Sequence, residues 1–168
     1  AVATVVFAGY FRTAFALLPV PDEIEYPISY RYEEVARLIG TSEITIGGKP
    51  GETVVVDLYW EALRPAEEKD VIVHVGALGN EQIRRHSYPA GGNLLATEWE
   101  PGEQWRERYF LTIPADSQPQ QSYPLVAGLY DISSAYTFLA FDEAGNEVFP
   151  VIGRITVHGE PVDNPEYT

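Results

Sequence analysis

The sequence contains no cysteine, and this absence removes several classes of site at once. Disulfide frameworks, zinc sites built from thiolates and cysteine nucleophiles are all excluded. The absence does not identify a compartment, because a chain of 168 residues can bury enough apolar surface to fold without covalent cross-links. Hydrophobic residues make up 45% of the chain and charged residues 21%, which is typical of a folded globular protein.

Positive charge is also scarce. The chain has 11 Lys and Arg residues against 25 Asp and Glu residues, which gives a net charge of −14. Nucleic acids and anionic lipid surfaces are themselves negative, so we expect neither as a partner of the folded part. An acidic surface favours solubility and is able to collect calcium.

The motifs of the common enzyme classes are missing as well. The three histidines, His74, His86 and His158, show no metal-binding spacing. No Gly-x-Ser-x-Gly nucleophile elbow occurs, and the glycine pairs at 47–48 and 91–92 are not followed by the Lys-Ser/Thr of a phosphate loop. We therefore predict a protein without catalytic residues, for which calcium is the one candidate cofactor.

The first 20 residues, AVATVVFAGYFRTAFALLPV, form an N-terminal apolar segment with Arg12 as its only charge. As a helix, about 18 residues would span about 27 Å, slightly less than a bilayer core. We predict a helix that ends at Pro19, although the β-branched and aromatic residues also suit a strand. Because this segment must be sheltered from water, we expect it to lie in a membrane, against neighbouring subunits of a homo-oligomer, or across its own domain. The residues expected to anchor or assemble the protein are Val2, Val5, Phe7, Tyr10, Phe11, Arg12, Phe15, Leu17 and Leu18.

Three further segments follow the apolar one. Residues 21–31 combine two prolines with acidic residues and predict an extended linker. Residues 32–159 show short runs of alternating apolar and polar residues between turn residues, which predicts an all-β, immunoglobulin-like two-sheet sandwich. Residues 160–168 are expected to be a loose tail. The predicted strands cover residues 35–39, 43–46, 53–60, 71–77, 82–86, 105–113, 123–130, 136–141, 147–151 and 154–158.

A few side chains of the sandwich are candidates for binding. Trp60 continues the apolar face of its strand, after Val54, Val56 and Leu58, and is expected in the core. Aromatic rings serve both packing and recognition. The candidates for stacking on a ligand such as a sugar are Trp99, Trp105, Tyr88 and Tyr136.

The acidic loop after residue 141 offers hard oxygen ligands for calcium. Its candidate ligands are Asp142, Glu143 and Asn146, with Asp131 at the end of a neighbouring strand as a further one. The loop lacks the spacing of an EF-hand, and the alternative interpretation is a solvated hairpin.

Several stretches of this sequence resemble a known module. They are VARLIG (35–40), PGETVVVDLYWEAL (50–63), VIVHV (71–75), PAGG (89–92), WEPGEQWRERYFLTIPAD (99–116) and YPLVAGLYD (123–131). They are similar to an uncharacterised extracytoplasmic immunoglobulin-like module of bacterial cell-envelope proteins, often C-terminal to glycosyltransferase-like membrane regions. The resemblance implies a location at the cell surface and a last membrane helix before the module, where residues 1–27 look similar. It implies no catalytic residues. The sequence departs from the pattern at Gln121, where the module usually has glycine, and at residues 86–88, where it usually has an aspartate.

Three functions fit these observations. The first is a non-catalytic structural or interaction protein of the bacterial cell surface, tethered or assembled through its apolar segment. The second is a subunit of an extracellular pilus-like filament, in which the segment packs against neighbouring subunits. The third is a carbohydrate-binding accessory domain.

Overall fold

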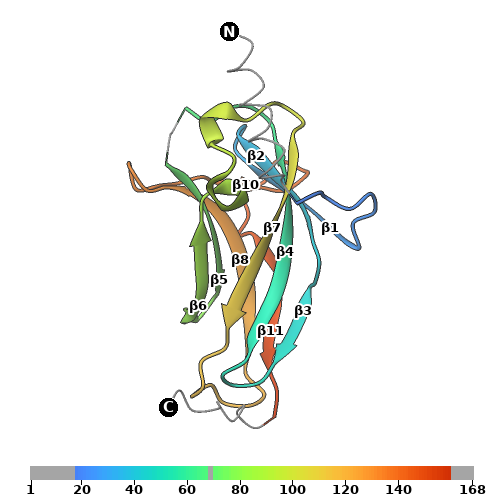
Figure 1. Ribbon diagram of the computed structural model, residues 1–168, viewed down its shortest axis with the longest axis vertical. Coiled ribbons are helices and arrows are strands. Elements are labelled where there is room, and N and C mark those ends of the chain that lie inside the picture. Colours follow the sequence, from blue (N-terminus) through green and yellow to red (C-terminus); the bar gives the residue numbers. More distant parts are fainter. Residues whose placement is uncertain (1–17, 68–69, 160–168) are drawn as a thin grey trace, which may run out of the picture.

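The computed structural model describes residues 18–67 and 70–159, which fold into two β-sheets packed face to face (Figure 1). Sheet 1 consists, in spatial order, of β10 (Ala140–Phe141), β1 (Tyr26–Tyr32), β2 (Ala36–Thr41), β4 (Thr53–Ala62) and β7 (Gln104–Thr112). Sheet 2 consists of β3 (Thr45–Gly48), β11 (Val151–Val157), β8 (Ser122–Asp131), β5 (Val71–Ala77) and β6 (Asn80–Ser87), with β9 (Tyr136–Thr137) paired to β8. Two short 3₁₀ turns, η1 (Pro89–Gly92) and η2 (Ala96–Glu98), lie between β6 and β7. The prediction of an all-β fold with two packed sheets is confirmed.

The alternation of β4 shows how the sequence places the core between the sheets. Val56, Leu58 and Trp60 are fully buried on the inner face, as their spacing predicts. The residues between them face outward, yet Asp57 and Tyr59 are only 5% and 6% exposed. Another part of the chain must therefore cover the outer face of sheet 1.

Three tryptophans and Tyr32 form an aromatic cluster in the core. The rings of Trp60 and Trp105 stack at 6.2 Å, and Trp99 lies 5.0 Å from Trp105. Trp99 and Trp105 are 1% and 0% exposed. This burial corrects their prediction as ligand-binding residues, because a ring enclosed on both faces presents no surface to a sugar.

The sheet begins earlier in the chain than predicted. Residues 26–32 form β1, although residues 21–31 were expected to be a linker. β1 pairs with β2 along its length, but β10 reaches only Arg31 and Tyr32 on the other side. Pro27 therefore lies on a stretch of β1 that has a strand on one side only, where a missing N–H is tolerated.

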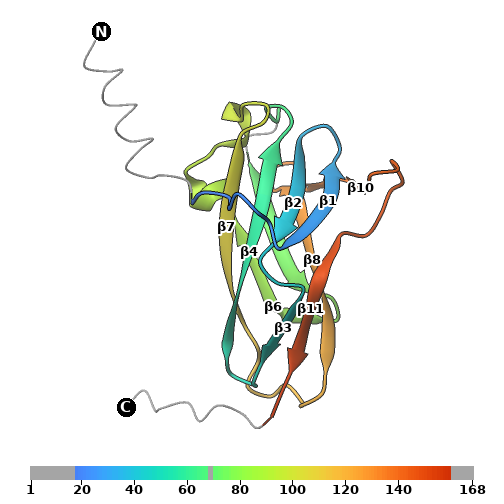
Figure 2. The same ribbon diagram turned by 90° about the vertical axis from the view of Figure 1, so that its right-hand side faces the viewer.

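The segment before β1 lies over the outer face of sheet 1. Residues 18–25, which we call the strap, run across the outer face of β7 and β4 to reach β1 (Figure 2). Arg106 of β7 donates its backbone N–H to the carbonyl of Leu18 at 3.2 Å, and these two residues form an antiparallel bridge. At the other end, Ile24 packs on Gly40 of β2.

The stretch expected as one strand over 136–141 is divided between the sheets. β9 pairs with β8 in sheet 2, whereas β10 pairs with β1 in sheet 1, so the chain crosses the sandwich between them. The strand expected over 147–151 is not formed as such: Glu147 makes an isolated bridge to Phe141, and β11 begins at Val151. A chain that changes sheets within four residues cannot keep the alternation of a single strand.

Most of the N-terminal apolar segment and the expected tail lie outside the described residues. This applies to the anchor candidates Val2, Val5, Phe7, Tyr10, Phe11, Arg12, Phe15 and Leu17, and to residues 160–168. Leu18 is described and is 47% exposed. Within the described ranges, the structure contains no helix of sufficient length and apolarity to cross a membrane.

Candidate functional site

The candidate site is a groove that forms where β8 changes its partner. Along one edge, β8 pairs first with β11, from Ser122 to Val126, and then with β9 at Tyr130 and Asp131. Between these two stretches the crossing chain leaves for sheet 1, so the edge of β8 has no continuous neighbour. The hydroxyl of Tyr32 reaches this gap from sheet 1 and donates to the carbonyl of Ala127 at 2.8 Å. This bond satisfies a buried acceptor that would otherwise lack a partner.

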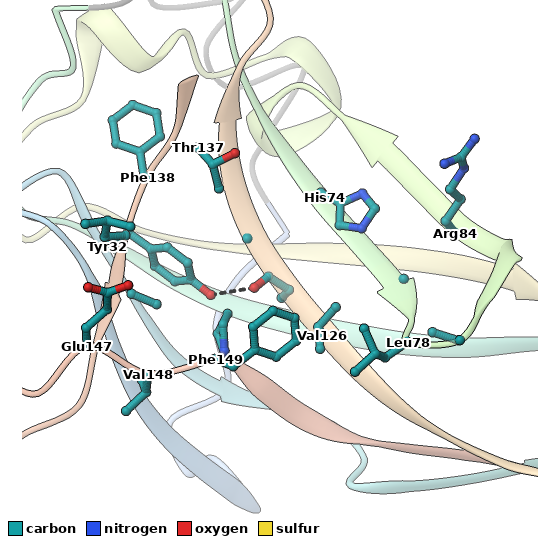
Figure 3. A pocket seen from close by; sticks show the side chains of 18 of the residues that line it. Tyr32, His74, Leu78, Arg84, Val126, Thr137, Phe138, Glu147, Val148 and Phe149 are labelled. Atoms are coloured by element: carbon teal, nitrogen blue, oxygen red, sulfur yellow. Dashed lines mark hydrogen bonds between the residues drawn. The ribbon is translucent and has the colours of Figure 1, made fainter. Parts of the chain in front are cut away.

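The groove has a cavity volume of about 640 Å³ and is mainly apolar (Figure 3). Phe149 and Val126 lie close together in it, and Leu78 closes one end. The side chain of Phe149 is 61% exposed and that of Leu78 is 49% exposed. Large apolar side chains that remain this accessible around one recess are typical of a binding surface.

Two glycines line the groove and differ in what occupies the space above them. Gly76 of β5 and Gly128 of β8 both line it. A Cβ atom at Gly128 would meet no atom within 4 Å, so the space above this residue is open. A Cβ atom at Gly76 would lie 2.9 Å from Nε2 of His74, so the imidazole occupies the space that a side chain would need.

Polar side chains border the apolar floor. His74 and Arg84 come from β5 and β6, Thr137 comes from β9, and Glu147 comes from the segment between β10 and β11 (Figure 3). Nδ1 of His74 lies 2.8 Å from Nε2 of His86, so one ring donates to the other. Burial lowers the pKa of His74, and the neighbouring His86 and Arg84 lower it further. At neutral pH the His74 ring is therefore an uncharged hydrogen-bonding group at the rim.

The two tyrosines that the sequence singled out lie in different places. Tyr136 is 44% exposed, donates to Oε1 of Glu33 at 2.6 Å and packs edge-on against Phe138, which lines the groove. Tyr88 is 42% exposed and precedes η1, away from the groove-lining residues. A ligand-binding role for these two residues stays a prediction.

The acidic loop forms a hairpin turn in which Asp142 has partners of its own. Its Oδ1 accepts the backbone N–H of Asn146 at 2.8 Å, and its Oδ2 accepts the Asn146 side-chain amide at 3.1 Å. The backbone N–H of Asn146 holds the pKa of Asp142 below its usual range. Asp131 is bound by Ser133 and Ser134. Among the described residues, no group of three or more acidic or histidine side chains converges on one point, and calcium binding stays a prediction.

A charged cluster under the strap serves the fold. Asp57 of β4 accepts two hydrogen bonds from Arg108, at 2.8 and 3.0 Å, and pairs with Arg106. Burial opposes the ionisation of Asp57, but the hydrogen bonds from Arg108 and Arg106 outweigh it and lower its pKa. This carboxylate therefore stays charged and paired at neutral pH.

A second buried acid, Glu107, organises the loop after β6. Its Oε1 accepts the backbone N–H of Ala90 at 2.8 Å, and its Oε2 accepts the Tyr109 hydroxyl at 2.9 Å. Tyr109 is also 2.8 Å from the hydroxyl of Ser87. Burial raises the pKa of Glu107 to about 8 in spite of these bonds. The carboxyl group is thus protonated at neutral pH and ties η1 to β7.

No protein family matches the chain, and no curated protein resembles it. The similarity to the envelope module therefore stays a prediction.

Sequence reasoning missed the groove itself. Phe149, Leu78 and Arg84 carry no motif, and they meet only because the chain crosses between the sheets. The one available signal was the pair of glycines inside strands, Gly76 and Gly128, since glycine in a strand interior often marks a close approach of another group.

Proposed function

We propose that the protein is a non-catalytic interaction module of the bacterial cell surface. In this proposal an immunoglobulin-like sandwich is tethered through the N-terminal apolar segment, and the groove of sheet 2 binds the ligand. The observation that carries the proposal is the groove: an open apolar recess with accessible Phe149 and Leu78, bordered by polar side chains.

The state of the buried acids supports a binding role over a catalytic one. Asp57 is paired with two arginines, Asp131 accepts hydrogen bonds from two serines, and Glu107 ties a loop to a strand. Each of these carboxyl groups has structural partners. None of the three lines the groove.

The composition of the groove favours a carbohydrate as its ligand. A sugar ring has apolar C–H faces and a rim of hydroxyl groups. The exposed ring of Phe149 offers a stacking surface, while Thr137, His74, Arg84 and Glu147 offer donors and acceptors around it. In this proposal the carbohydrate binds in the groove, because the tryptophans are buried.

The proposal is tested by one substitution that removes an aromatic ring from the groove and another that fills the groove. A glycan array on residues 18–168 would identify a binding sugar, and calorimetry would measure its affinity. Phe149→Ser removes the exposed ring, and Gly128→Leu fills open space above the floor. We expect each to weaken binding by at least about tenfold, which is about 1.4 kcal/mol.

The matched control is Phe110→Ser. Phe110 is 54% exposed on β7 of the other sheet, so the same change there should leave the affinity unaltered. Absence of binding to every glycan, or equal effects of Phe149→Ser and Phe110→Ser, would remove the carbohydrate assignment.

The tether is tested separately. The full chain should partition into membranes, and deletion of residues 1–17 should give a monomer in buffer. Filaments of the full chain in the electron microscope, which disappear on this deletion, would favour the pilus-like alternative instead.

A further inference from the structure

The strap holds the junction of the sandwich and the N-terminal apolar segment in one place. Its first residue, Leu18, is bridged to Arg106 at the free edge of β7. Ile24 is partly buried against Gly40, where a Cβ atom would come within 2.3 Å of its Cγ2 atom. The strap crosses the outer face of sheet 1, on which Asp57 and Tyr59 are buried (Figure 2). The apolar segment therefore joins the sandwich at a docked point and not through a free linker.

The docked point lies beside the loop that carries η1 and η2. Leu18 shares a cavity of about 290 Å³ with Ser87, Ala90, Gly91 and Asn93. The loop is tied to β7 there, because Glu107 accepts the Ala90 N–H at 2.8 Å. The neighbouring residue of β7, Arg106, bridges to Leu18, so the loop and Leu18 are both attached to the same part of this strand.

This loop differs from the rest of the surface in its chemistry. Residues 88–97, YPAGGNLLAT, contain no charge, in a chain whose net charge is −14. Tyr88 and Leu95 are 42% and 49% exposed, and Leu18 beside them is 47% exposed. The loop at the opposite end, residues 114–121, reads PADSQPQQ and is polar. Figures 1 and 2 both show these loops at opposite ends of the sandwich.

We propose that residues 88–97 and Leu18 form a surface that rests on the lipid bilayer. This inference depends on the proposed tether, since the apolar segment that enters the membrane continues directly into Leu18. An uncharged loop with an exposed tyrosine and leucine suits the boundary between head groups and acyl chains. Zwitterionic lipid is the expected partner, because an acidic protein is repelled by anionic head groups. The sandwich then stands on this end, and the groove on sheet 2 remains open to its ligand.

The absence of cysteine makes the test direct, because one introduced cysteine carries the only label. The full chain is reconstituted in phosphatidylcholine vesicles, with an environment-sensitive fluorophore at Leu95→Cys or, as the control, at Asp116→Cys in the opposite loop. Asp116 is exposed in the structure. We expect vesicles to shift the emission of the label at position 95 to shorter wavelength and nitroxide lipids to quench it. The label at position 116 should show neither change.

The strap is tested by Ile24→Ser in the labelled Leu95→Cys chain, with circular dichroism to confirm the fold. Loss of the docked point should reduce quenching at position 95 while the chain still floats with vesicles. Tyr88→Cys gives a second position if Leu95→Cys does not fold.

The outcomes separate the two proposals. If the chain does not float with vesicles, the tether fails and this inference with it. If the chain floats but the labels at 95 and 116 behave alike, only the lipid contact is wrong. If the emission at position 95 shifts at high protein concentration even without vesicles, the loop contacts a second copy of the chain, and the inference is overturned.

Discussion

Replacement of Glu107 by glutamine should stabilise the protein increasingly as the pH rises. The carboxyl group is 4% exposed, and its burial raises its pKa from 4.5 to about 8. The fold therefore holds the neutral acid, while the unfolded chain releases its proton above pH 4.5. Glutamine keeps an acceptor for the Ala90 N–H and an N–H for the Tyr109 oxygen, without a charge to bury.

The sign and size follow from proton linkage. Between pH 4.5 and about 8 the folded state binds more protons than the unfolded state, so stability is lost as the pH rises through this window. The full loss is about 5 kcal/mol, of which about 3 kcal/mol has occurred by pH 7. At pH 4 both states are protonated, and the effect of the carboxyl group vanishes.

Urea unfolding of the parent and of Glu107→Gln at pH 4, 5.5, 7 and 8.5 measures this difference. The gap between the two free energies of unfolding should widen by about 4–5 kcal/mol from pH 4 to pH 8.5. The control is Glu98→Gln, since Glu98 is exposed, and its curve should run parallel to that of the parent. A constant gap between parent and Glu107→Gln would show that Glu107 is ionised in the fold and would refute the reasoning.

Three further substitutions test other parts of the fold. Asp57→Asn leaves the guanidinium groups of Arg106 and Arg108 without their counter-charge and should destabilise the fold by about 2–3 kcal/mol at pH 7. Because the pKa of Asp57 is lowered in the fold, the stability that its charge contributes is lost as the pH drops through the folded-state pKa. Urea unfolding at pH 7 and pH 2.5 measures this loss, and an equal cost of Asp57→Asn at both pH values would show that the pairing is unimportant. Trp105→Ala opens a cavity beneath Trp60 and should cost about 3–5 kcal/mol in urea unfolding, whereas a cost below about 1 kcal/mol would contradict its place in the core. Tyr32→Phe leaves the carbonyl of Ala127 unsatisfied at the gap in β8 and should lower the free energy of unfolding by about 1–2 kcal/mol; faster amide exchange around Ala127 would accompany it, and unchanged exchange would argue that water replaces the hydroxyl.

The sequence predicted those parts of the fold in which side-chain alternation reflects burial on one face. β4 is the clearest case, since its inner residues Val56, Leu58 and Trp60 are buried as predicted. Its outer residues could not be assigned, because Asp57 is buried in a cluster with Arg106 and Arg108, which lie about 50 residues later in the chain. Pro27 misled in the same region, since its tolerance in β1 depends on how far β10 extends.

The candidate site was beyond the reach of the sequence for a related reason. Aromatic residues are the best local signal for binding, but Trp99 and Trp105 had a larger apolar surface to bury and lie in the core. Phe149 lies in the segment between β10 and β11, which runs beside β8 where Ala127 donates to the carbonyl of Pro150, and this relation between segments has no local pattern. The glycines at positions 76 and 128 suggested that another group approaches these strands closely, but the sequence did not show what occupies the space above them.

The order in which the strands are synthesised has a consequence for how the molecule matures. β11 is the last strand of the described residues, yet it lies inside sheet 2, between β3 and β8, and joins β3 in parallel. Until residues 151–157 have left the ribosome, β3 has no neighbour in its sheet and the edge of β8 is bare. The nascent sandwich is therefore open to aggregation or proteolysis until residues 151–157 have been synthesised. Completion of this one strand gives β3 and β8 the neighbour that closes sheet 2.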